Sequence, residues 1–101
     1  MDFLQKVNDH IEENRAEMIS SLSRLISVPS VAVSSDGKYP FGEDVQRAYE
    51  LMMQLAQDEG FVTFDADSYG GHIDFKGSDK GIVGVIGHLD VVPEGDGWDF
   101  E

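Results

Sequence analysis

Residues 81–87 read Gly-Ile-Val-Gly-Val-Ile-Gly, a continuous apolar run interrupted only by glycine. Such a run is typical of a β-strand covered on both faces, because a strand with one wet face alternates apolar and polar side chains. It needs helices or further strands on both of its faces. The run therefore predicts a buried strand over residues 82–87.

Two upstream segments have the pattern of helices. The first helix is predicted to begin after Asp2, a suitable N-cap, and to end before Pro29, which forces Val28 out of the helical region. A second helix is predicted from near Glu43, where acidic residues suit the positive end of the helix dipole, to Gly60. The apolar stripe of the first helix follows spacings of three, four and seven: Leu4, Val7, Ile11, Met18, Leu22 and Leu25.

Strand patterns follow the helices. Residues 61–66 ("FVTFDA") and 72–75 ("HIDF") are strand-like, and "DSYGG" between them is a turn. Two helices, a hairpin and a buried strand predict an α/β fold. A chain of 101 residues forms one small domain at most, or a part of a larger one, since it buries only roughly 60–70% of its unfolded surface.

The composition limits the partners and the chemistry. Twenty acidic and seven basic residues give a net charge of −13. This balance argues against nucleic-acid or anionic-membrane partners, because both need a basic patch. The chain has no cysteine, so a metal would be held by histidine and carboxylate groups. It shows neither a signal-peptide pattern nor an apolar run of about 20 residues, which predicts a cytoplasmic protein.

His88 and Asp90 follow the predicted buried strand. In an extended chain, residues two apart project to the same side, so the two side chains are expected together, with Leu89 pointing away. Open α/β sheets bind ligands at the carboxyl ends of their strands. A metal-bound histidine often donates its second ring N–H to a carboxylate. The spacing alone leaves two interpretations open, a metal site and an ordinary polar strand end.

The other candidate residues have simpler interpretations. His10 lies in the polar part of the first helix and His72 opens a short strand, so both are predicted to be structural. The acidic residues near the end of the chain are predicted to form a solvated loop, not a metal cage: Glu94, Asp96, Asp99 and Glu101.

The segment "GHLDVVPEGDGW" resembles the first metal-site motif of the M20 family of metallopeptidases. In that family an apolar strand runs into H-x-D-x-V-P and then a Gly/Trp loop. The upstream "LISVPSV" also resembles the end of the family's N-terminal helix. Within the family, "PFGEDVQRAYELMMQLAQDEGF" and "DSYGGHIDFKGSDKGIVGVIGHLDVVP" are most similar to the dipeptidase branch known as PepV or Xaa-His dipeptidase.

The resemblance implies a role for each residue of the motif. It makes His88 a ligand of one of two zinc ions, and Asp90 the catalytic-site carboxylate that holds and polarises a metal-ligating imidazole. The implied reaction is hydrolysis of an amide bond in dipeptides with a free amino terminus, by a water shared between two metals and a glutamate base. Val91, Val92 and Pro93 would shape the site without direct chemistry.

The resemblance also implies that the general base and the other metal ligands lie downstream in the family. It therefore predicts that residues 1–101 are the N-terminal part of an M20 catalytic domain, inactive alone. Two alternatives remain: an M20-type deacylase or desuccinylase that acts on acylated amino acids, and a non-catalytic α/β module in which His88 and Asp90 merely cap a strand.

Overall fold

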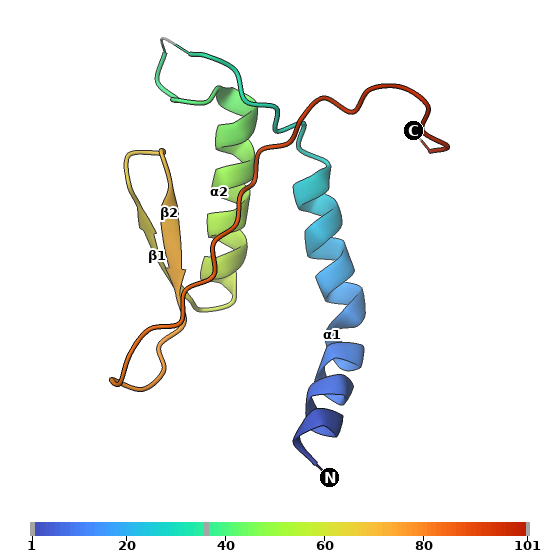
Figure 1. Ribbon diagram of the computed structural model, residues 1–101, viewed down its shortest axis with the longest axis vertical. Coiled ribbons are helices and arrows are strands. Elements are labelled where there is room, and N and C mark those ends of the chain that lie inside the picture. Colours follow the sequence, from blue (N-terminus) through green and yellow to red (C-terminus); the bar gives the residue numbers. More distant parts are fainter. Residues whose placement is uncertain (1, 36, 101) are drawn as a thin grey trace.

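The computed structural model describes residues 2–35 and 37–100. Its elements are two helices, α1 (Phe3–Ile26) and α2 (Glu43–Asp58), followed by two strands, β1 (Val62–Asp65) and β2 (Gly71–Asp74). Figure 1 shows α2 between the hairpin and α1, with the two chain ends far from the hairpin. The predicted α/β class, with two helices and a hairpin, is confirmed.

Helix α1 begins and ends where its capping residues predict. The Asp2 carboxylate accepts a hydrogen bond from the Gln5 N–H at 2.7 Å, which satisfies one of the free amides of the first turn. The helix ends at Ile26, two residues before the Val28-Pro29 pair. Its apolar stripe is not covered, since α1 has no buried residue among those described. The stripe is amphipathic in sequence but has no partner along most of its length.

Helix α2 forms the packed centre of the molecule. Gly42 precedes it with a φ of 96°, a conformation that favours glycine, and Gly60 follows it with a φ of 88°. The core of the described residues is small: Ala48 is 1% exposed and Ala56 is 7% exposed, both on α2.

None of the helices among the described residues combines the length and the apolar character that crossing a membrane requires.

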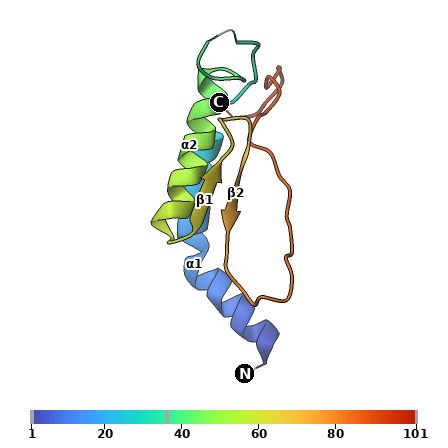
Figure 2. The ribbon, with the colours of Figure 1, turned by 90° about the vertical axis from the view of Figure 1, so that its left-hand side faces the viewer.

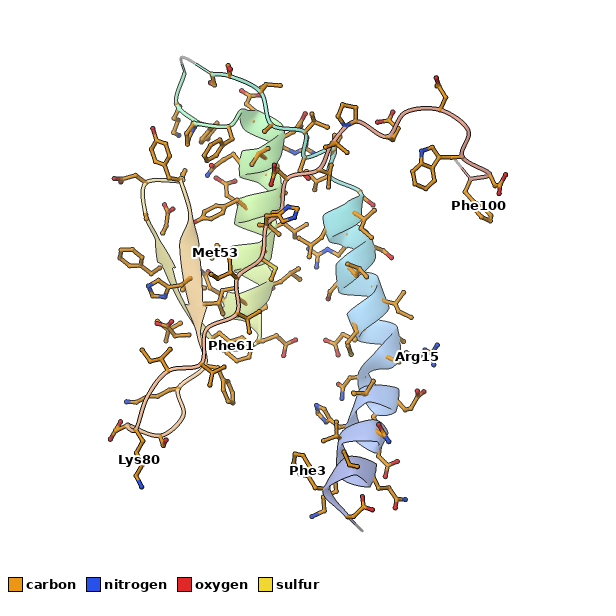
Figure 3. All side chains as sticks on the ribbon, in the orientation of Figure 1. Phe3, Arg15, Met53, Phe61, Lys80 and Phe100 are labelled. Carbon is orange, nitrogen blue, oxygen red and sulfur yellow. The ribbon has the colours of Figure 1, made fainter. Side chains whose placement is uncertain are left out.

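The hairpin packs on α2. Strands β1 and β2 pair in antiparallel register, with Val62 opposite Asp74 and Asp65 opposite Gly71. Figure 2 shows the hairpin lying along one side of α2, and Met53 of α2 extends toward it (Figure 3). A Cβ atom at Gly71 would collide with the Phe64 carbonyl, the Tyr49 hydroxyl and the Met53 methyl group. Glycine at this position therefore permits the hairpin to approach the helix.

The prediction of a buried strand over residues 82–87 is wrong for this structure. The segment follows an extended path, crosses in front of α2 in the view of Figure 1 and stands apart from that helix in Figure 2, and it forms no strand. Its four aliphatic side chains are between 94% and 100% exposed: Ile82, Val83, Val85 and Ile86. A strand is held by hydrogen bonds to its neighbours, and the sheet of the described residues has only two strands, β1 and β2. The apolar run supplies the composition of a strand without a partner to pair with.

Candidate functional site

His88 and Asp90 lie at the end of the extended segment, where it meets the connection between α1 and α2. Val91 forms an isolated parallel bridge with Val31, which fixes the chain directly after the two candidate residues. Both candidates line an open groove whose other lining residues include Tyr49 and Met53 of α2 together with residues of β2. The candidate pair therefore faces the main packed unit of the molecule.

The structure brings the two side chains together. The His88 Nδ1 atom lies 3.0 Å from the Asp90 backbone oxygen and 3.2 Å from the Asp90 Oδ1 atom. A ring that is protonated on Nδ1 satisfies both contacts and leaves Nε2 with a free lone pair. The His88 side chain is 82% exposed, so that lone pair is accessible. This arrangement suits a histidine that binds a metal ion through Nε2.

A buried serine anchors the backbone beside the pair. Ser30 is 2% exposed, and its hydroxyl donates to the Leu89 carbonyl at 2.8 Å. Its own carbonyl accepts from the Val91 N–H at 2.9 Å. The sequence pattern does not predict a role for Ser30. The available signal was a small polar residue directly between Pro29 and Val31, in the short stretch "VPSV" whose other residues are apolar.

The sequence reasoning also missed a partner of His72. Its Nδ1 atom lies 2.8 Å from the Asp74 Oδ1 atom, and its ring stacks on Phe64 with a centroid distance of 5.1 Å. The signal was present, because Asp74 stands two residues after His72, as Asp90 stands after His88. The stacking and the pairing keep the ring of His72 engaged within the hairpin.

Tyr49 is the one described residue whose pKa is clearly shifted. Its hydroxyl donates to the Asp65 Oδ1 atom at 2.7 Å and lies 3.1 Å from the Gly70 carbonyl. Partial burial, followed by the hydrogen bond to Asp65 and the charge of that carboxylate, raises the pKa of Tyr49 to about 12. The tyrosine stays protonated at neutral pH, and it ties α2 to the turn of the hairpin.

The donor set fits zinc at one ligand position. His88 offers an imidazole nitrogen, with the Asp90 carboxylate against the other ring nitrogen. Within residues 2–35 and 37–100, no three His, Cys, Asp or Glu side chains gather closely enough to hold a metal. The acidic residues Glu94, Asp96 and Asp99 are exposed, whereas Glu101 lies outside the described residues. The described part of the chain thus brings together one imidazole and one carboxylate, fewer than the three protein ligands that a catalytic zinc typically has.

Comparison with known proteins finds relatives that are named as dipeptidases. No family model matches the chain. It is 38% identical over 96 residues to a Staphylococcus haemolyticus protein, 43% identical over 75 residues to a Bacillus subtilis protein and 33% identical over 94 residues to a Staphylococcus aureus protein. Each of the three bears the name "Putative dipeptidase".

The matches cover most of this chain and a small part of each relative. They include 92%, 74% and 90% of the chain, in the same order. The corresponding shares of the relatives are 20%, 16% and 20%. The chain therefore spans about a fifth of the length of the curated relatives that it matches.

Proposed function

We propose that this chain is the N-terminal segment of a cytoplasmic zinc dipeptidase of the M20 type, in its PepV branch. The observation that carries the proposal is the His88–Asp90 pair, in which Nδ1 faces Asp90 and Nε2 is free. Relatives with dipeptidase names support the substrate class. The alternatives, a deacylase and a non-catalytic module, have no specific observation in their favour.

In this proposal His88 binds one of two zinc ions through Nε2. When bound, the two ions supply a Lewis acid for the scissile carbonyl and lower the pKa of water. Asp90 accepts a hydrogen bond from the Nδ1–H group of His88, which fixes the tautomer and makes Nε2 a stronger donor of electrons to a metal. The remaining ligands and the general base would come from residues beyond this segment of the full-length protein.

The substrate panel that tests the proposal uses the zinc-loaded full-length protein that contains this chain. We expect hydrolysis of dipeptides with a free amino terminus, and much slower release of the acyl group from N-acetyl and N-succinyl amino acids. The 101-residue chain alone, with added zinc, is the negative control, since its described residues gather only one of the three protein ligands that a catalytic zinc typically has.

Three results would contradict the proposal. Preference for acylated amino acids would move the protein to the deacylase branch. Absence of zinc and of activity in the full-length protein would favour the non-catalytic module. Turnover by the 101-residue chain alone, after contaminating peptidases are removed, would show that the segment holds a complete site of another kind.

A further inference from the structure

Ser30 is one of the two buried polar residues of the described chain, the other being Gln46. It lies between the end of α1 and the bridge at Val31, and it is 2% exposed. A hydroxyl removed from water in this way is costly unless it finds a hydrogen-bond partner. Ser30 finds that partner in the backbone of the His88 segment, at the Leu89 carbonyl.

The two hydrogen bonds of Ser30 bracket Asp90. The hydroxyl of Ser30 holds the carbonyl of Leu89, 59 positions away along the chain, at 2.8 Å. The carbonyl of Ser30 holds the N–H of Val91 at 2.9 Å. Among the described residues, these two bonds are the hydrogen bonds that join residues 81–100 to the rest of the molecule.

The position of Asp90 then decides the orientation of His88. Both contacts of the imidazole Nδ1 atom are with Asp90, one with its backbone oxygen and one with its Oδ1 atom. The His88 side chain is 82% exposed, so little packing holds the ring apart from these two contacts. If the Leu89 and Val91 peptides rotate, Asp90 moves with them and the ring loses its partner.

We propose that Ser30 is a positioning residue for the metal site: its hydroxyl fixes the Leu89–Val91 backbone so that Asp90 holds His88 with Nδ1 protonated and Nε2 free. The metal in this inference rests on the proposed function, whereas the hydrogen bonds and the tautomer do not. Ser30 contacts neither substrate nor metal, and it acts through Asp90.

The test compares Ser30→Ala and Ser30→Thr in the full-length protein that contains this chain. The first readout is the tautomer of His88 in the metal-free protein, measured by NMR with 15N-labelled histidine and assigned by the signal that His88→Ala removes. We expect the Nδ1–H form in the wild type, a mixture of tautomers in Ser30→Ala, and recovery in Ser30→Thr, which keeps the hydroxyl.

The second readout is zinc binding and turnover. We expect Ser30→Ala to weaken zinc binding or lower kcat by about 10–100-fold, as loss of outer partners of a metal ligand does, with KM nearly unchanged. Ser30→Cys keeps the size of the side chain but donates weakly, so it should fall between serine and alanine. This variant also serves if Ser30→Ala does not fold.

Ser27→Ala is the matched control. The Ser27 hydroxyl also donates to a backbone carbonyl, that of Ser23, at 2.7 Å, but at the exposed end of α1. In Ser27→Ala we expect the His88 tautomer, the zinc affinity and kcat to equal those of the wild type. An equal effect of Ser27→Ala would overturn the proposal, because it would indicate general loosening of this region.

The remaining outcomes are also decisive. An unchanged tautomer in both Ser30→Ala and Ser30→Cys overturns the positioning role, whatever happens to melting temperature. If the wild type neither binds zinc nor hydrolyses dipeptides, the proposed function fails. In that case a tautomer that changes in Ser30→Ala and recovers in Ser30→Thr still supports the role of Ser30.

Discussion

Residues 71–74 and 87–90 are both Gly-His-aliphatic-Asp tetrapeptides, Gly-His-Ile-Asp and Gly-His-Leu-Asp. A side-chain hydroxyl contacts a backbone carbonyl at both places, directly before the first tetrapeptide and within the second. Tyr49 reaches the carbonyl of Gly70 at 3.1 Å, and Ser30 reaches that of Leu89 at 2.8 Å. The same four-residue pattern and the same kind of anchor therefore occur in two places.

The surroundings of the two tetrapeptides differ. In the first, the ring of His72 stacks on Phe64 and pairs with Asp74 inside a hairpin that packs on α2. In the second, the ring of His88 has no aromatic neighbour among the described residues, and its side chain is 82% exposed against 58% for His72. A histidine engaged by its own hairpin is a structural element, whereas one held only through Nδ1 is available to a ligand.

Replacing each of the two histidines is expected to give the largest difference in zinc content and activity between the two tetrapeptides. In the full-length protein, His88→Ala should remove zinc from the site and lower activity by more than the roughly 10–100-fold that loss of an outer partner costs. His72→Ala should keep zinc and turnover. Zinc content by atomic absorption and initial rates on a dipeptide measure both. Normal zinc and rate in His88→Ala would show that the ligand assignment is wrong.

Replacing the two aspartates should give a smaller contrast. Asp90→Asn keeps the shape but weakens the acceptor for Nδ1, so we expect most of the zinc to remain and kcat to fall by about 10–100-fold. Asp74→Asn should leave kcat unchanged, since its partner His72 stacks on Phe64 within the hairpin and is not a proposed zinc ligand. Steady-state kinetics of the two variants measure this contrast. An equal fall in kcat in both variants would contradict the different roles given to the two His–Asp pairs.

The glycines that open the tetrapeptides offer a contrast in stability. Gly71→Ala places a methyl group against Phe64, Tyr49 and Met53, and such overpacking costs typically about 1–3 kcal/mol. No atom lies within 4 Å of a Cβ built at Gly87, so Gly87→Ala should change the free energy of unfolding by less than about 0.5 kcal/mol. Urea unfolding of the 101-residue chain, followed by circular dichroism, measures both. If Gly87→Ala strongly lowered the free energy of unfolding of the full-length protein but not that of the 101-residue chain, residues beyond this segment would be shown to pack against Gly87.

Tyr49→Phe tests the anchor of the first tetrapeptide. Loss of its hydrogen bonds should cost about 1 kcal/mol at neutral pH without affecting zinc. The pKa of Tyr49 is raised to about 12 in the folded state, against about 10 when unfolded. Between pH 10 and 12 the unfolded state has lost the proton that the folded state keeps, so stability falls as pH rises through this window. The variant should lack this pH-dependent loss, so the urea midpoints of the wild type and Tyr49→Phe should differ less at pH 11.5 than at pH 9. An equal difference between the two midpoints at both pH values would contradict the prediction.

The helices and the hairpin could be predicted because their signals are local. Asp2 and Pro29 bound α1 within a few residues of the predicted ends, and Gly60 follows α2 as expected. The strand over residues 82–87 could not be judged this way, since a strand depends on a partner that the run itself does not specify. Local composition predicts what a segment is able to form, and pairing decides whether it does.

The candidate site shows the same division. The juxtaposition of His88 and Asp90 follows from their spacing of two residues in an extended chain, and the structure places them together. The same spacing places His72 and Asp74 together in the hairpin. Ser30 could not be predicted as an anchor, because its partner Leu89 lies 59 positions away. The metal-binding role of His88 stays a prediction.

The contact between Ser30 and Leu89 also has a consequence for the order in which the protein is assembled. Helix α2 and the hairpin contact each other within residues 43–74, so this unit can form early from neighbouring parts of the chain. The Ser30 contact closes a loop of 59 positions and is secured by few bonds, so the entropy of that loop opposes it. During synthesis Ser30 leaves the ribosome well before residues 87–90, so the contact can form only after these later residues have emerged. We therefore expect the candidate site to be among the last parts of this segment to form and among the first to open, and hydrogen exchange at the Val91 amide would report both events.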